Sequence, residues 1–142
     1  MEYSKELMKH FKNPKFIKDV KDSNGVGEVG NVSCGDIMHL EIRVRPPRGY
    51  PETFSKKALQ GAIIEDIGFK TFGCAAAIAS SDVVCELAKG KTLAQAEKIK
   101  KDDIVEKLKG MPRIKVHCSV LGIEALKKAI GDYRGKEGKG IC

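Results

Sequence analysis

Cysteines are the residues of this chain best suited to chemistry, and three of the five share a setting. Cys118 follows His117 where an extended stretch gives way to a predicted helix, in MPRIKVHCSVLGIEALKKAI. Cys74 lies in FGCAAAIAS, at a predicted strand-to-helix junction, and Cys34 lies in the turn GNVSCGDIM, just before Asp36. A helix N-terminus presents unpaired N–H groups and the positive end of its dipole, which favour a thiolate over a thiol. We therefore expect Cys74 and Cys118 to be more reactive than a free cysteine. Because all three thiols lie at element ends, with Asp or His beside two of them, we expect the three to act together.

The neighbours of these thiols indicate which metal they would bind. Three thiolates with a carboxylate or an imidazole are too soft a ligand set for magnesium or calcium, and they suit zinc or an iron–sulfur cluster. Asp36 and His117 supply the carboxylate and the imidazole. Four thiolates usually hold a cluster permanently, whereas an oxygen or nitrogen ligand leaves a weaker bond at which the cluster can be released. The pattern therefore indicates a site that could hand a cluster on.

The other two cysteines lie where the sequence indicates no ligand role. Cys85 lies mid-helix on an apolar stripe with Ile78 and Ala88, so we expect it in the core. Cys142 is the last residue, and we expect no ligand role for it. An odd cysteine count with wide spacing argues against a disulfide framework, and the lack of a CxxC motif argues against a zinc ribbon, zinc finger or thioredoxin-type site.

Composition predicts one globular domain over residues 1–142, with a net charge of +7. No apolar run approaches the ~18 residues of a membrane span, and the N-terminal stretch lacks the apolar core of a signal peptide. We therefore expect a cytoplasmic protein with no membrane partner. Residues 109–142 hold eight Lys and Arg against three Asp and Glu, which favours an acidic protein partner. No nucleic-acid recognition motif is visible, so we expect no nucleic-acid partner.

The order of predicted elements is strands first and helices afterwards. The strongest signal is residues 37–44, where apolar and polar residues alternate as in a half-buried strand. This order predicts an α+β fold, with helices packed on one face of a small antiparallel sheet of about three strands. The predicted strands are an irregular edge strand within 22–32, then 37–44 and 62–72. The predicted helices are 3–12, 74–90, 92–99, 101–110 and one that starts near residue 117.

Two segments lie outside this pattern. Residues 45–62 join two predicted strands, and this connection is far longer than a hairpin needs. We interpret it as an inserted inter-strand connection that shields the site or a partner edge, with two turns of helix in its second half. Residues 135–142 are polar and glycine-rich, which predicts a flexible tail.

The motifs in combination resemble the iron–sulfur cluster assembly scaffold proteins of the IscU/NifU N-terminal family. The resemblance covers nearly the whole chain through YSKELMKHFKNP, GNVSCGDIMHLEIRV, IIEDIGFKTFGCAAAIASSD, KGKTLAQAEKI and RIKVHCSVLGIEALKKAIGDY. It implies a SufE/NifU-like fold and a scaffold, not an enzyme. Such a scaffold assembles a [2Fe–2S] cluster from Fe²⁺ and sulfur and transfers it to apo iron–sulfur proteins.

The resemblance also implies a role for each site residue. Cys34, Cys74 and Cys118 would be the cluster ligands. Asp36 and His117 would be exchangeable fourth ligands, with Asp36 affecting cluster lability. Cys118 would accept the sulfur, and Lys115 would lie near the incoming sulfur or iron.

The implied partners are a cysteine desulfurase, or free sulfide, as the sulfur source, and apo-proteins as acceptors. A homodimer that shares ligands across its interface stays open. The family's chaperone-recognition stretch is Leu-Pro-Pro-Val-Lys, but here Arg113 replaces the second proline between Pro112 and Ile114. This change removes part of the extended rigidity and adds charge, which argues against delivery by a dedicated chaperone pair. The closely related Suf-type scaffold lacks the histidine of the His–Cys pair, so His117 places this chain nearer the Isc side.

Other functions fit parts of the same pattern. A structural or regulatory zinc protein could use the same Cys, Asp and His residues, and Zn²⁺ could fill the site in the isolated protein. A cysteine-nucleophile enzyme with His117 as its base is a weaker alternative, because adjacent side chains usually point apart.

Overall fold

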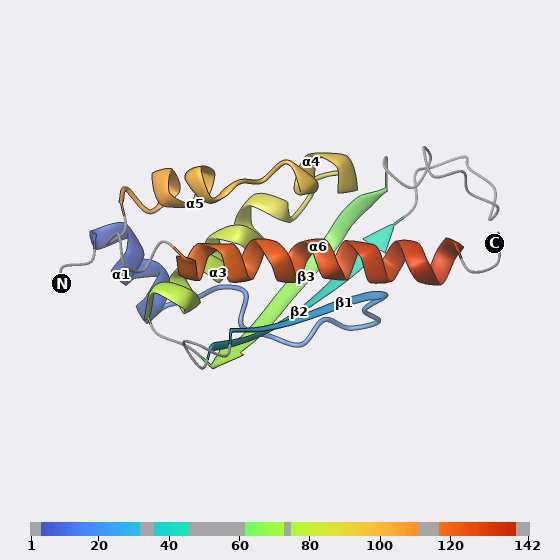
Figure 1. The fold of residues 1–142 in the computed structure, drawn as a ribbon, viewed down its shortest axis with the longest axis horizontal. Helices are drawn as coiled ribbons and strands as arrows, with labels where there is room; N and C mark the ends of the chain where they lie inside the picture. Colours follow the sequence, from blue (N-terminus) through green and yellow to red (C-terminus); the bar gives the residue numbers. More distant parts are fainter. Residues whose placement is uncertain (1–3, 32–35, 46–61, 73–74, 111–116, 139–142) are drawn as a thin grey trace.

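The computed structural model describes residues 4–31, 36–45, 62–72, 75–110 and 117–138. Within these ranges the strands precede all helices except the first (Figure 1). The strands are β1 (Gly25–Asn31), β2 (Asp36–Arg45) and β3 (Ile63–Phe72). The helices are α1 (Lys5–Lys12), α3 (Ala75–Ala88), α4 (Leu93–Glu97), α5 (Lys101–Lys107) and α6 (His117–Gly138).

The strands form an antiparallel sheet in the order β1–β2–β3. β2 is central because it pairs with β1 along one edge and with β3 along the other. Its alternation of apolar and polar residues buries one face and leaves the other polar. Leu40 pairs with Phe69 and Ile42 with Ile67, so large apolar side chains from adjacent strands meet on the same face. The predicted alternation is confirmed by the buried residues of β2, which are Met38, Leu40, Ile42 and Val44.

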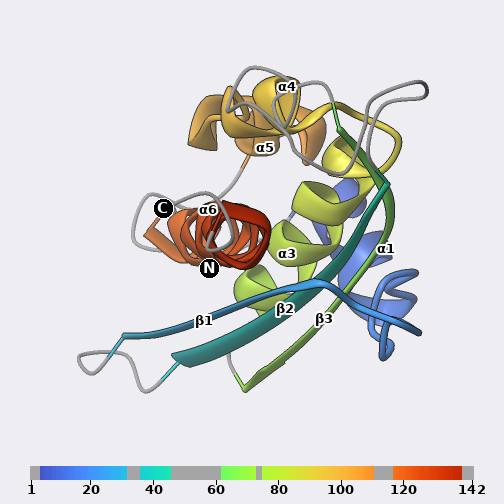
Figure 2. The same cartoon turned by 90° about the vertical axis from the view of Figure 1, so that its right-hand side faces the viewer.

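Two helices cover this apolar face (Figure 2). α6 lies against β1 and β2, and α3 lies against β3 and α6. α1 packs in turn on α3. The apolar side chains of sheet and helices thus share one core, and the predicted α+β class with helices on one face of a small antiparallel sheet is confirmed.

Side chains cap α1 and α4 at their N-termini. At α1, the Ser4 hydroxyl accepts a hydrogen bond from the Leu7 amide at 3.0 Å. At α4, Thr92 and Gln95 form a reciprocal capping box. These contacts satisfy amides that the helices themselves leave unpaired.

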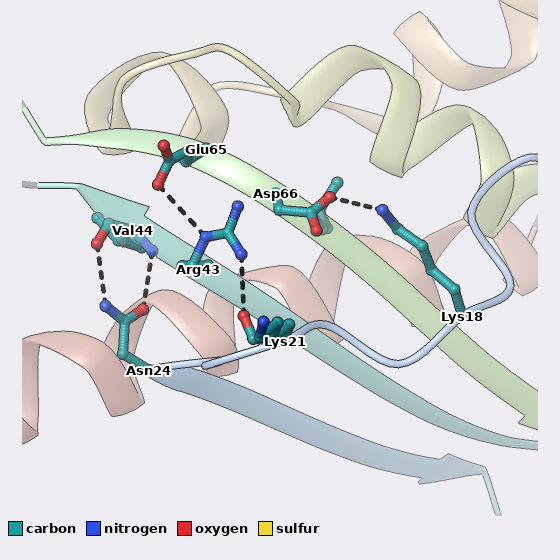
Figure 3. Close-up of polar contacts among 8 residues, drawn as sticks. Lys18, Lys21, Asn24, Arg43, Val44, Glu65 and Asp66 are labelled. Atoms are coloured by element: carbon teal, nitrogen blue, oxygen red, sulfur yellow. Dashed lines mark hydrogen bonds and ion pairs between the residues drawn. The ribbon is translucent and has the colours of Figure 1, made fainter.

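Residues 16–24 form a strap that the sequence does not predict. The Phe69 amide donates to the Phe16 carbonyl at 2.9 Å, so the strap covers the outer edge of β3. It then crosses the polar face of the sheet, where Arg43 Nη1 donates to the Lys21 carbonyl at 3.0 Å (Figure 3). A paired and covered edge does not recruit further strands, so the strap closes β3 against aggregation.

The strap ends on a two-way contact with β2. The Asn24 side-chain amide donates to the Val44 carbonyl at 2.9 Å, and its oxygen accepts from the Val44 amide at 2.8 Å (Figure 3). This contact satisfies the backbone N–H and C=O groups of Val44, which lies beyond the part of β2 that pairs with β1.

Lys18 of the strap forms an ion pair with Asp66 of β3, at 2.7 Å between Nζ and Oδ1 (Figure 3). Burial opposes the charged carboxylate, but the hydrogen bond from Lys18, the hydrogen bond from the Ile67 amide and the charge of Lys18 outweigh it and lower the pKa of Asp66. A lowered carboxyl pKa gives stability that is present above the ordinary value and lost as pH falls through the folded one.

Replacing Lys18 with methionine should therefore reduce the free energy of unfolding by roughly 0.5 kcal/mol at pH 7, because the pair is partly exposed. The loss should shrink toward pH 3, as Asp66 begins to protonate. Urea unfolding at pH 7 and at pH 3 measures this loss. Lys5→Met, which replaces an exposed lysine of α1, is the control. An unchanged loss at pH 3 would contradict the assignment.

Several predicted segments lie partly outside the described residues. The ranges 32–35, 46–61 and 139–142 are among these, so the 45–62 connection and its helix stay predictions. α6 continues to Gly138, through the first half of the segment predicted as a tail. β1 lies at the sheet edge as predicted, but its pairing with β2 is regular throughout instead of irregular. Among the described residues, no helix combines the length and apolarity needed to cross a membrane.

Candidate metal centre

The start of β2 meets the ends of its two neighbours at one end of the sheet. Asp36, the first residue of β2, pairs with Asn31, the last residue of β1. Ile37 pairs with Phe72, the last residue of β3. The backbone at Asp36 therefore lies beside the points where the chain leaves β1 and β3 (Figure 1).

α6 lies directly on the backbone of β1. A Cβ atom at Gly27 would lie 2.0 Å from the Ala125 carbonyl oxygen, and one at Gly25 would lie 2.5 Å from that of Ala129. No side chain fits in that space, so only glycine permits this approach. Residue numbers rise along α6 as they fall along β1, so the two elements run antiparallel.

This contact aligns the start of α6 with the end of β1. Four helical residues advance about 6.0 Å, and two strand residues about 6.8 Å, so the two backbones keep nearly in step. Two further steps along β1 from Gly27 reach Asn31, and two along α6 from Ala125 reach His117. The first turn of α6 therefore lies toward the end of the sheet that carries Asp36 (Figure 1).

α3 starts at the same end as α6 (Figure 1). It begins at Ala75, shortly after β3 ends. A Cβ at Gly122 of α6 would lie 3.1 Å from Val84 Cγ2 and 3.5 Å from Ser81 Cα, so the two helices pack closely. The two helices therefore direct the positive ends of their dipoles to one side of the molecule, which favours anions there.

The elements that carry or flank the predicted ligands thus share one end of the fold. Asp36 is placed through its backbone at the start of β2, and His117 and Cys118 at the start of α6. The ligand assignment itself stays a prediction. Within the described residues, no three His, Cys, Asp or Glu side chains group together to hold a metal ion. The candidate site residues that lie outside the described residues are Cys34, Cys74 and Lys115.

Cys85 lies in a different environment from that predicted for the ligand cysteines. It is fully buried in the core face of α3, which confirms the sequence prediction. Burial, and after it the negative charge of Asp82, raises the pKa of its thiol well above the ordinary value. A thiol that resists ionisation is a poor nucleophile and a poor metal ligand.

A buried acidic residue of α3 is the main polar feature that the sequence did not predict. Asp82 is 1% exposed, and its Oδ1 accepts hydrogen bonds from the amides of Lys15 and Phe16 at 2.8 and 3.0 Å. The His10 ring donates from Nδ1 to Oδ2 at 2.7 Å. The only signal was a charged residue inside the apolar helix sequence AAAIASSDVVCELA. Asp82 therefore joins α1 and the start of the strap to α3.

Comparison with known proteins shows the family to which a chain with this fold and these motifs belongs. The family model described as the NifU-like N terminal domain matches residues 2–140. The chain belongs to the NifU-like N-terminal domain family. The resemblance inferred from the cysteine motifs is thereby confirmed.

Relatives of this NifU-like chain match it along nearly its full length. Over 137 residues it is 46% identical to the iron-sulfur cluster assembly scaffold protein IscU 1 of Archaeoglobus fulgidus, which covers 96% of this chain and 80% of the relative. Over 141 residues it is 44% identical to the iron-sulfur cluster assembly scaffold protein IscU of Haemophilus influenzae, with 97% and 100% covered.

The fold is shared with solved NifU-like structures. The crystal structure of a nitrogen-fixing NifU-like protein (N-terminal) from Brucella abortus superposes with a TM-score of 0.68 at 16% identity, covering 93% of this chain and 94% of that one. At such low identity the likeness concerns the fold, and it confirms the predicted NifU-like architecture.

Proposed function

We propose that this chain is a scaffold on which an iron–sulfur cluster is assembled and from which it passes to apo-proteins. The observation that carries this proposal is the identity of 41–46%, over nearly the whole chain, to proteins named as iron-sulfur cluster assembly scaffolds. The shared end of β2, α3 and α6 supports it, because an anionic cluster would meet the positive ends of two helices there.

The cluster would be a [2Fe–2S] unit held by Cys34, Cys74 and Cys118. Asp36 or His117 would complete the ligand set as the exchangeable member. Thiolates bind iron strongly, and a single harder ligand gives an incoming acceptor thiolate a bond to displace. Retention and release would thus follow from one mixed ligand set.

Sulfur would enter at Cys118. In this proposal its thiolate attacks the outer sulfur of a desulfurase persulfide, so that the sulfane sulfur moves to Cys118 and the desulfurase cysteine leaves as a thiolate. An external two-electron reductant would then convert this sulfur into the sulfide of the cluster and restore the Cys118 thiolate. Lys115 would lie nearby and attract anionic sulfur species. Free sulfide is the alternative source, and it requires no persulfide on Cys118.

The chain would act as a carrier rather than as an enzyme, because its own side chains would be the ligands of the cluster until the cluster passes to an acceptor. A structural zinc protein would instead keep its metal. The named relatives favour the scaffold over this alternative. Zn²⁺ remains a competitor for the same donors, since it binds N/S sites more tightly than Fe²⁺ does.

A transfer assay tests this function. The chain is loaded anaerobically with Fe²⁺ and sulfide, and is then mixed with an apo-[2Fe–2S] ferredoxin in the presence of a chelator. We expect holo-ferredoxin, followed by its circular dichroism, to form faster than from free iron and sulfide at the same concentrations. Equal rates, or complete interception by the chelator, would refute transfer from a scaffold.

Replacing Asp36 with cysteine should slow release. The substitution exchanges a carboxylate for a thiolate, which binds cluster iron more strongly. We expect the loaded variant to keep its visible absorption several-fold longer and to transfer its cluster correspondingly more slowly. Asp36→Ser, which removes the carboxylate without adding a thiolate, is the matched control. Equal cluster lifetimes in the two variants would show that residue 36 is not a cluster ligand.

A further inference from the structure

A groove lies between α6 and the segment that links α4 to α5. It encloses about 390 Å³, and its apolar floor is formed by Ile99 of the link and by Val120 and Ile123 of α6. Ile99 and Val120 are half-buried, so part of this apolar surface faces solvent. The groove therefore offers apolar side chains that the described part of the chain does not cover.

Lysines outnumber acids around the groove. Its exposed carboxylate is Asp102, and Glu97 is half-buried. An adjoining hollow of about 400 Å³ shares Lys98 and Ile99 and adds Lys91 and Asp103, whose charges cancel. The excess of lysines over acids therefore lies at the groove itself, where it favours an acidic occupant. The four exposed lysines that line the groove are Lys98, Lys100, Lys101 and Lys127.

We propose that this groove docks an acidic segment of a partner protein. An apolar side chain of that segment would lie on Ile99, Val120 and Ile123, and its carboxylates would face the lysines. Apolar burial supplies affinity at the centre of such an interface, and the charged rim steers association. Among the described residues, none that lines either hollow is aromatic, whereas single-stranded nucleic acids are held by stacking on aromatic rings.

The groove lies close to the candidate metal centre along α6. Val120 is three residues from His117, a rise of about 4.5 Å along the helix axis. A docked segment would therefore bring its own protein beside the first turn of α6. Its use as a sulfur donor or cluster acceptor rests on the proposed function, but the docking itself does not.

Titration of the full, cluster-free chain with a peptide tests the docking. The probe is a twelve-residue peptide of glutamates around two central leucines, and the matched peptide carries lysine in place of every glutamate. We expect chemical shift changes in ¹H–¹⁵N spectra to concentrate on residues 97–102 and on Val120, and to weaken as salt is raised. Changes spread over the surface, or equal changes with the lysine peptide, would overturn the proposal.

Charge reversal at the groove supplies the decisive comparison. Lys98→Glu combined with Lys101→Glu should weaken binding of the acidic peptide about tenfold. Lys5→Glu combined with Lys12→Glu on α1 changes the net charge equally and should leave binding nearly unchanged. Equal weakening by both pairs, or tighter binding of an oligodeoxythymidine at the groove, would refute an acidic protein segment as occupant. Because the measurement needs no cluster, its outcome is independent of cluster loading.

Discussion

Replacing Asp82 with alanine is expected to lower the free energy of unfolding by about 3 kcal/mol. The carboxylate is buried and accepts hydrogen bonds from two amides and from His10, whose Nε2 also lies 3.7 Å from Glu86 Oε2. Alanine would leave those partly buried donors without their acceptor. Chemical denaturation at neutral pH measures the loss.

A matched control separates this network from a general effect of lost charge. Asp19 is 78% exposed and pairs with Lys70 at 2.7 Å, so Asp19→Ala should cost far less than Asp82→Ala. Hydrogen exchange gives a local readout, because Phe16 accepts the Phe69 amide hydrogen bond and lies directly beside the Asp82 contacts. The Phe69 amide should exchange faster in Asp82→Ala. Unchanged exchange together with a small loss would show that Asp82 does not hold the strap.

Replacing Gly27 with alanine is expected to lower stability by about 2 kcal/mol and to reduce cluster loading strongly. The new Cβ would lie 2.0 Å from the Ala125 carbonyl oxygen and 2.7 Å from the Ala129 amide nitrogen. Both contacts are backbone atoms, so α6 must move away from β1. Because α6 begins at His117, its first turn would move relative to Asp36.

Two other glycines serve as controls that separate displacement of α6 from a general loss of stability. Gly68→Ala places its Cβ 2.5 Å from the Lys18 carbonyl oxygen on the opposite face of the sheet, so it should destabilise without moving α6. Gly131 of α6 has open space, and Gly131→Ala should stabilise by up to about 1 kcal/mol. We expect iron content after anaerobic loading to fall only in Gly27→Ala. An equal fall in Gly68→Ala would show that stability alone is responsible.

The sequence predicts the elements whose burial follows from a simple period. The alternation of residues 37–44 predicts β2 because one face meets the core, and Thr92 with Gln95 predicts the start of α4 because both groups are local. The three thiols at element ends, beside Asp36 and His117, suffice to suggest a metal centre and then a family. These signals need no knowledge of long-range packing.

Features that depend on long-range approach were not predictable. The glycines of β1 suggest irregular structure in isolation, and only the position of α6 shows that Gly25 and Gly27 permit a backbone contact. The strap follows no hydrophobic period, because hydrogen bonds and ion pairs such as Lys18 with Asp66 hold it on the sheet. Asp82 interrupts an apolar helix, but its partners lie more than 60 residues away along the chain.

Mössbauer spectroscopy of the chain reconstituted anaerobically with ⁵⁷Fe²⁺ and sulfide tests the central claim most directly. The chain itself should show the quadrupole doublet of a diamagnetic [2Fe–2S]²⁺ cluster. Separate serine replacements of Cys34, Cys74 and Cys118 should abolish or greatly reduce this doublet. Cys85→Ser, which alters a buried thiol outside the proposed ligand set, should retain it wherever the variant stays folded. A doublet that survives each of the three ligand replacements, or that never forms in the unaltered chain, would contradict a cluster held by these thiolates.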